Sequence, residues 1–222
     1  TVMCLSAGTA NISYSLGFGC SVSKTITVNP LPSPITGIST MCNGSNTVMT
    51  DLPSPGGTWS GSGPFIAVGS LSGNVTGIAA GSGIVSYTLP TGCYVIHPLT
   101  VLTAPSAISG STSVCVGANT GLTNSVLGGI WTSTTPALAT IGSISGVVGG
   151  IAPGVASITY ALGTGCSVSG MVTVNPLPNP ITGSMGICTG GTSLLFDASP
   201  AGTWSCVDVS IATIGGSTGM AT

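Results

Sequence analysis

The sequence predicts an all-β protein, built as a tandem array of small antiparallel β-sandwiches of about 73 residues each. Short runs of Val, Ile, Thr and Tyr alternate with turns of Gly, Pro, Asn and Ser, which is typical of such sandwiches. No stretch combines a 3.6-residue apolar period with helix caps, so we expect essentially no helix. The third observation is a repeat with steps of 73 residues, and one of 72, in two aromatic series: Tyr14, Tyr87 and Tyr160, and Trp59, Trp131 and Trp204.

Within one repeat the pattern predicts seven strands separated by turns. Asn43-Gly44 is a tight-turn signal between the first two strands. In the repeat of residues 38–110 we expect strands at Ser39–Cys42, Thr47–Thr50, Thr58–Ser60, Ile66–Val68, Asn74–Ile78, Ile84–Leu89 and Cys93–Leu102.

The repeat divides the chain into four segments. Residues 38–110 and 111–183 are two whole repeats, residues 1–37 match the C-terminal half of a repeat, and residues 184–222 match the N-terminal half. We therefore expect residues 1–37 of a next unit to complete residues 184–222, the sequence being one period of a longer polymer. Linkers at 29–37, 102–110 and 175–183 join the segments. The first and last are Pro-rich and predict semi-rigid connections, and the middle one is softer.

The recurring aromatic residues are expected to form the structural core of each sandwich, because they carry the largest apolar area available to a small domain. A platform that stacks carbohydrate is the alternative interpretation. The set comprises Trp59, Trp131, Trp204, Tyr14, Tyr87 and Tyr160.

Charge is almost absent: the chain has one Lys, no Arg, three Asp and one His. Nucleic-acid binding is excluded, because neutralising phosphates requires many Lys and Arg. An electrostatic role at a membrane surface fails for the same reason. The apolar window 137–162 contains Gly and Pro and ends in an alternating strand pattern, so we expect no membrane insertion. Asp51 and Asp197 fit turn-capping acceptors better than calcium ligands.

Eight cysteines indicate an oxidising compartment. One class precedes the first hairpin turn (Cys42, Cys115, Cys188) and the other opens the last strand (Cys20, Cys93, Cys166). Pairs within a repeat, Cys42–Cys93 and Cys115–Cys166, are one scheme. The other scheme, which we favour because it would stiffen a fibre, joins neighbouring repeats as Cys42–Cys166. The two additional cysteines lie in the divided repeat, where Cys206 is expected to bond Cys4 of the next unit. Neither class forms a metal-binding pattern, and no cofactor is expected.

The residues also carry a resemblance. Gly57-Thr58-Trp59-Ser60 followed by Val85-Ser86-Tyr87 resembles the bacterial immunoglobulin-like repeat of the group 2 type. The variant with Gly165-Cys166-Ser167-Val168 is similar to repeats in very large surface proteins of Bacteroidota. The resemblance covers essentially the whole chain and implies immunoglobulin-like sandwiches. It specifies function weakly, because the family includes adhesins, stalks and phage decorations.

These observations favour a structural subunit or repeating segment of an extracellular filament or stalk, with the chain itself as partner in a homopolymer. A cell-surface adhesin whose binding domain lies outside this sequence is the alternative, and a phage decoration is a third reading. An enzyme is not expected, because a single His, no paired carboxylates and no phosphate-binding loop are present.

Overall fold

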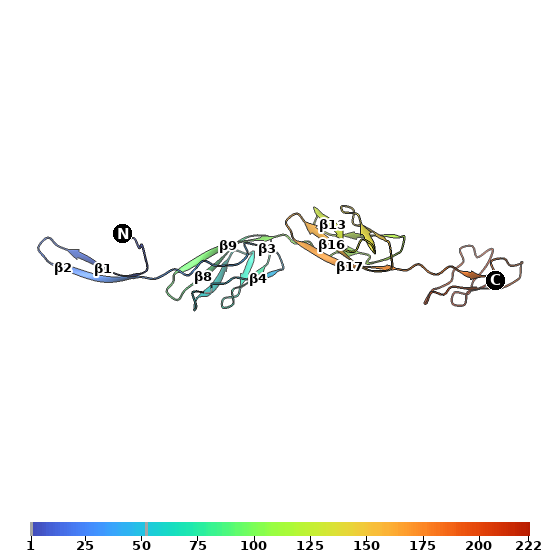
Figure 1. Ribbon diagram of the computed structural model, residues 1–222, viewed down its shortest axis with the longest axis horizontal. Coiled ribbons are helices and arrows are strands. Elements are labelled where there is room, and N and C mark those ends of the chain that lie inside the picture. The colour runs from blue at the N-terminus through green and yellow to red at the C-terminus, as the bar shows by residue number, and fades with distance from the viewer. Residues whose placement is uncertain (1, 52) are drawn as a thin grey trace. The chain divides into compact units, whose positions relative to one another are not determined.

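The computed structural model describes residues 2–51 and 53–222, so that residues 1 and 52 of the expected segments lie outside it. Over the described residues the chain forms strands and contains no helix, which confirms the predicted all-β class (Figure 1). Accordingly, this part of the chain has no helix long and apolar enough to cross a membrane. It separates into two compact units: one of residues up to Ile108 with 124–130 and 160–169, the other of 109–123, 131–159 and 170–222.

Every strand expected in residues 38–110 is present, with ends that differ from the prediction by at most three residues. The predicted turn follows the first of them, since Gly44 has a φ of 81° and Ser45 N donates to Cys42 O. The strands are β3 (Thr40–Cys42), β4 (Asn46–Val48), β5 (Thr58–Ser62), β6 (Ile66–Val68), β7 (Asn74–Gly77), β8 (Gly81–Thr88) and β9 (Tyr94–Leu102).

The other segments repeat this order of strands. Residues 2–28 contain only β1 (Gly8–Ser15) and β2 (Ser21–Val28). The next whole repeat has β10 (Ser109–Gly110), β11 (Ser113–Cys115), β12 (Asn119–Thr123), β13 (Gly129–Ser133), β14 (Ala139–Ile141), β15 (Val147–Gly150), β16 (Gly154–Leu162) and β17 (Ser167–Asn175). The last segment has β18 (Thr182–Gly183), β19 (Ser193–Phe196) and β20 (Met220–Ala221).

Each whole repeat consists of two sheets. In the 38–110 repeat one sheet has the strand order β3-β9-β8-β5 and the other the order β4-β7-β6. The corresponding sheets of the 111–183 repeat are β11-β17-β16-β13 and β10-β12-β15-β14, the latter with an added edge strand. The short strands β3 and β11 run parallel to the last strands β9 and β17. By contrast, β9 pairs antiparallel with β8, as β5 does on the other side of β8. This division of strands between two sheets is the arrangement of immunoglobulin-like sandwiches.

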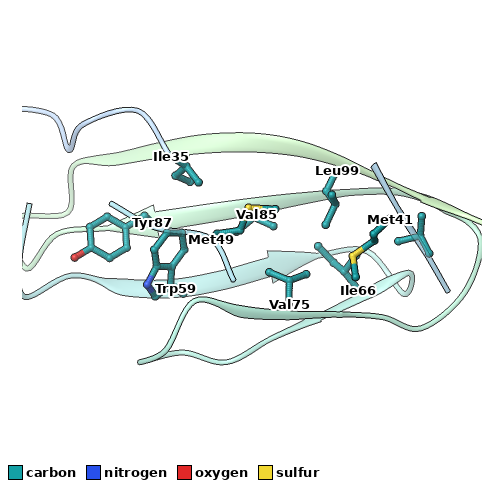
Figure 2. Close-up of a cluster of buried hydrophobic side chains, with 10 residues drawn as sticks. Ile35, Met41, Met49, Trp59, Ile66, Val75, Val85, Tyr87 and Leu99 are labelled. Atoms are coloured by element: carbon teal, nitrogen blue, oxygen red, sulfur yellow. The ribbon is translucent and has the colours of Figure 1, made fainter. Parts of the chain in front are cut away.

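The core of the 38–110 repeat lies between its two sheets, where alternate residues of each strand point inward. Trp59 on β5 and Tyr87 on β8 are register partners, and their ring centroids are 4.7 Å apart. Val75, Val85 and Leu99 fill the remainder with almost no exposed surface. Figure 2 shows these side chains converging from facing strands. Trp131 and Tyr160 are buried in the same way, in the positions expected of core aromatic residues.

Contacts of the first sandwich begin before residue 38. Ile35 is buried in its core, and Thr36 forms an antiparallel bridge with Thr50. The Pro-rich segment therefore ends in a single β-bridge, which the residue pattern alone did not reveal because only one residue on each side takes part in the pairing. The exact boundaries of the 73-residue domains remain a prediction.

The packing makes Trp59 the residue on which this sandwich should depend most. Trp59→Ala is expected to lower the free energy of unfolding of its domain by about 3–5 kcal/mol, because it leaves a cavity beside Tyr87. Guanidinium unfolding of the full chain followed by circular dichroism measures this change. Leu71→Ala is the control, since Leu71 is exposed, and a loss of similar size there would contradict the assignment.

Candidate functional site: an exposed hairpin and an open half-sandwich

A tyrosine hydroxyl anchors the loop before the tryptophan strand in the 38–110 repeat. Tyr87 Oη accepts a hydrogen bond from Gly57 N (2.9 Å) and donates one to Ser54 O (2.6 Å). Its ring leaves no space for a side chain at Gly57, because a Cβ there would lie 2.5 Å from Tyr87 Cζ. Tyr87 thus packs against Trp59 and fixes the backbone two residues before it.

The next repeat has the same arrangement. Tyr160 Oη accepts from Gly129 N (2.8 Å) and donates to Val126 O (2.8 Å). A Cβ at Gly129 would lie 2.4 Å from Tyr160 Cζ. In both whole repeats, therefore, a tyrosine ring packs directly on the glycine two residues before the tryptophan. We call this position, the glycine with the loop carbonyl that accepts from the tyrosine hydroxyl, the tyrosine seat.

The third version of this seat is empty in the described chain. Gly202 precedes Trp204 by two residues and corresponds to Gly57 and Gly129, but a Cβ at Gly202 would have nothing within 4 Å. The corresponding tyrosine is Tyr14 on β1, and it is 71% exposed, whereas Tyr87 is 5% exposed. The structure thus does not bring Tyr14 and Trp204, both expected as core residues, into a common core.

A cavity marks the empty seat. It has a volume of about 980 Å³ and lies in the C-terminal segment. Its lining combines the residues that correspond to the tyrosine seat with apolar groups of the preceding linker: Leu177, Ile181, Ser199, Gly202 and Trp204.

The hairpin β1–β2 carries the counterparts of the core side chains, Tyr14 among them, that fill the corresponding place in the whole repeats. Its two strands pair with one another over their full length and form a sheet of two strands only (Figure 1). Ile12 is 43% exposed, although its equivalents Val85 and Ile158 are completely buried. The β1 side chains that correspond to core residues of the whole repeats are thus exposed, because no second sheet of the described chain packs against them.

The C-terminal segment lacks the sheet that this hairpin builds elsewhere. In the whole repeats, the equivalents of β1 and β2 lie between a short parallel edge strand and the tryptophan strand. The matching residues, 186–188 and 202–206, form no strand here. The segment retains only the opposite sheet, β18-β19-β20.

Sequence reasoning singled out the aromatic residues and missed the glycine seat. The signal was available, because Gly57, Gly129 and Gly202 all stand two residues before a tryptophan. A conserved spacing does not reveal why the glycine is needed, since the tyrosine that covers it lies about 30 residues further along the chain.

One disulfide joins Cys42 and Cys166, whose Cα atoms are 5.9 Å apart, and both cysteines belong to the first compact unit. This is the pair between neighbouring repeats that we favoured, and it rules out Cys42–Cys93 and Cys115–Cys166 in the same molecule. Six cysteines are free thiols, and all are at least partly exposed: Cys4, Cys20, Cys93, Cys115, Cys188 and Cys206.

Two of the three carboxylates, those of Asp197 and Asp208, cap turns. Asp197 Oδ1 accepts from Ser199 N at 2.6 Å, and Asn124 Oδ1, at the corresponding position, accepts from Val126 N at 3.0 Å. Hydrogen bonds from the Ser199 hydroxyl and backbone lower the pKa of Asp197, and bonds from Ser210 lower the pKa of Asp208. The prediction that Asp51 caps a turn is wrong, because neither of its carboxylate oxygens accepts a hydrogen bond among the described residues, and Pro53, two residues further on, has no N–H to donate. In the same part of the chain no three His, Cys, Asp or Glu side chains gather as metal ligands.

No family model matches the chain, and no curated protein matches it. Among solved structures it is similar to domains 1–6 of surface layer protein SbsC, with 16% identity over 98% of this chain and 41% of that chain and a TM-score of 0.34. It is also similar to a C-terminal 282-residue fragment of intimin in complex with the translocated intimin receptor, with 17% identity over 69% of this chain and 67% of that chain and a TM-score of 0.40. A third similar structure is the SGBP-B protein of Bacteroides ovatus, with 17% identity over 93% of this chain and 62% of that chain and a TM-score of 0.27.

The chain thus spans about two fifths of the length of the first of these structures. Sequence identities and TM-scores this low assign the chain neither a family nor a function. The resemblance to group 2 repeats and to Bacteroidota surface proteins therefore remains a hypothesis.

The scarcity of charge predicts a flat dependence of stability on pH. The pKa values of Asp197 and Asp208 are lower in the folded chain than in the unfolded one, so their contribution is present above the unfolded pKa and is lost as pH falls through the folded pKa. We expect the melting temperature to stay constant between about pH 5 and 7.5 and to fall only below about pH 4. Scanning calorimetry of the thiol-blocked chain measures it, and a marked drop near neutral pH would contradict this account.

Proposed function

We propose that the chain is a structural subunit of an extracellular filament, with no catalytic role. In this proposal copies join end to end. The hairpin β1–β2 of one copy completes the half-sandwich formed by residues 184–222 of the preceding copy. The completed sheet has the order 186–188, β2, β1, 202–206, by analogy with β11-β17-β16-β13.

The empty tyrosine seat carries the proposal. In both whole repeats a glycine N–H and a loop carbonyl hold one tyrosine hydroxyl, and in the 38–110 repeat the tyrosine ring also packs against Trp59. Gly202, Trp204 and Ser199 line a cavity with no tyrosine in it, and Tyr14 stands exposed on a hairpin with no sandwich around it. The occupant that fits the seat is therefore Tyr14 of a second copy, with its hydroxyl between Gly202 N and Ser199 O.

The two surfaces are complementary over more than this one contact. On the hairpin, the counterparts of buried residues are Ala10, Ile12, Tyr14, Ile26 and Val28. On the C-terminal segment, they are Ile187, Leu195, Trp204 and Ala212. Burying a large apolar side chain stabilises by about 1.5–3 kcal/mol, so this set is sufficient to drive association without charged contacts.

The geometry of this joint generates a filament. The hairpin and the half-sandwich are different surfaces of one chain, and a head-to-tail contact between different surfaces extends as an open chain unless its rotation closes a ring. Addition of strands to an open sheet supplies main-chain hydrogen bonds in the same step. With one Lys and three Asp in the chain, such a joint should be largely insensitive to salt.

Hydrogen bonds from backbone N–H groups to asparagine side chains hold the linker that follows the first sandwich, which favours a stiff fibre. Asn43 Oδ1 accepts from Ala104 N at 2.5 Å, and Asn124 Oδ1 accepts from Ser106 N at 3.3 Å. Two backbone N–H groups in the first half of the linker are thus held by side chains of the flanking repeats. The Cys42–Cys166 bond adds a covalent link between the flanking repeats and supports an extracellular location.

The joint also offers a place for a disulfide between Cys206 and Cys4 of the next copy. Their counterparts in the 111–183 repeat are Ser133 and Gly150. Ser133 Oγ donates to Ala139 O at 2.7 Å, and Ala139 is the register partner of Gly150. The two positions therefore lie on either side of one residue in a complete sandwich.

A substitution at the empty seat tests the proposal. Gly202→Val places a side chain where nothing stands in the single chain, and it should block the seat for Tyr14 and abolish assembly while leaving the monomer folded. Gly121→Val is the matched control, because a Cβ there also meets nothing and the equivalent residues of the other repeats are Val48 and Leu194. Electron microscopy and sedimentation of the purified chain in reductant measure assembly.

Filaments from the wild type and Gly121→Val but not from Gly202→Val are the expected result. A wild-type chain that stays monomeric at high concentration would overturn end-to-end completion and favour the adhesin-repeat alternative. Filaments that form equally well with Gly202→Val would remove Tyr14 from the joint.

A further inference from the structure

The bonded cysteines Cys42 and Cys166 lie in two kinds of turn, and both turns recur at the unpaired cysteines. Cys42 O accepts from Ser45 N at 3.1 Å in a turn whose Gly44 has a φ of 81°. Cys115 and Cys188 accept from the residue three further on, at 3.0 and 2.8 Å, beside Gly117 and Gly190 with φ values of 77° and 82°. The first class of cysteine is thus presented identically in all three repeats.

The second class is equally regular. Cys166 O accepts from Leu162 N at 2.9 Å, and Gly165 before it has a φ of 92°. Cys93 and Cys20 accept from Leu89 N and Leu16 N, each at 2.9 Å, after glycines with φ values of 85° and 84°. Four free thiols therefore occupy backbone settings that, in the pair Cys42 and Cys166, form a disulfide.

The surroundings of Cys93 point to its partner. Cys93 Sγ lies 3.8 Å from Asn29 O, and both residues belong to the first compact unit. The repeat equivalents of Asn29 are Leu102 and Asn175, which are the register partners of Cys42 and Cys115 on the parallel edge strands. When a preceding copy completes the sandwich around β2, its Cys188 takes the position beside Asn29 and so comes within reach of Cys93.

We propose that each joint between copies is locked by two further disulfides, Cys115 with Cys20 of the next copy and Cys188 with Cys93 of the next copy. The inference rests on the proposed end-to-end completion and specifies its covalent chemistry. The rule is the one that Cys42–Cys166 obeys: a cysteine of the first class bonds the second-class cysteine of the following repeat. For Cys115 that repeat is the composite sandwich, and for Cys188 it is the first whole repeat of the next copy.

Each bond forms by exchange with a low-molecular-weight disulfide such as oxidised glutathione. One cysteine thiolate attacks the disulfide and releases one glutathione thiolate. The second cysteine then displaces the other, so that two cysteine thiols are oxidised, one glutathione disulfide is reduced, and the two protons end on the released thiols. All four cysteines are at least partly exposed, as this exchange requires.

The test mixes unlabelled and ¹⁵N-labelled full-length chain, assembles it in a glutathione redox buffer, blocks residual thiols and digests with pepsin at acidic pH to prevent exchange. Mass spectrometry then reads each cross-linked peptide pair. We expect Cys115–Cys20 and Cys188–Cys93 peptides with mixed labels, which marks them as bonds between copies, while Cys42–Cys166 carries one label only. Unreduced denaturing gels should show a ladder in steps of 21.3 kDa that collapses to one band on reduction.

Other outcomes separate this inference from the proposed function. Filaments whose Cys20, Cys93, Cys115 and Cys188 are blocked as free thiols, or are paired in another order, overturn the disulfides and leave end-to-end completion standing. Mixed-label peptides without filaments in reductant overturn non-covalent completion alone. As a matched pair of variants, Cys188→Ser should free only Cys93, and Cys115→Ser should free only Cys20, whereas a loss of both bonds in either variant contradicts the pairing.

Discussion

The insertion of a two-stranded hairpin between two short strands is the interaction on which each sandwich depends. In the whole repeats, β8–β9 and β16–β17 lie at the centre of a four-stranded sheet and bring a tyrosine onto the glycine that precedes the neighbouring tryptophan by two residues. Where the hairpin is absent, the flanking residues 186–188 and 202–206 have no strand structure. The hairpin therefore organises both its neighbours and the core beneath it.

This dependence explains how one element can serve both folding and association. A hairpin held inside its own repeat completes a domain, and the same hairpin offered to another copy would complete a joint with the same contacts. The interface then has the packing and main-chain hydrogen bonding of a protein interior, which is typical of permanent assemblies. In the proposed joint, the contacts of the tyrosine and of the strands would each have a counterpart in the 38–110 and 111–183 repeats.

The near absence of charge fits this construction. Cohesion in this chain rests on buried apolar side chains, backbone hydrogen bonds and a disulfide, and two of its three carboxylates, Asp197 and Asp208, cap their own turns. Exposed sheet edges that carry few charged residues are a hazard for a protein that must stay monomeric. For a protein that must bind copies of itself, the same edges are an advantage, and covalent bonds between copies would then supply the permanence that ion pairs do not.

Much of the fold could be predicted from residue patterns. The strands of the 38–110 repeat were found to within three residues, because alternating Val, Ile and Thr runs and turn glycines encode local geometry directly. The buried Ile35 and the bridge between Thr36 and Thr50 were missed, since a pairing of one residue with another leaves no periodic signal. The role of Gly57 and Gly129 was missed for a related reason, as the ring that requires them comes from a distant strand.

By itself, the sequence determined the all-β class, the 73-residue period, the turn positions and the two classes of cysteine, because each of these is written in local spacing. It left the disulfide pairing open between two schemes. Only the tertiary structure chose Cys42–Cys166, and only it showed that Tyr14 stands outside a core while the seat at Gly202 is empty. The reason is physical: a bond between thiols and the burial of a ring depend on distances between segments that are far apart in sequence, which no local pattern specifies.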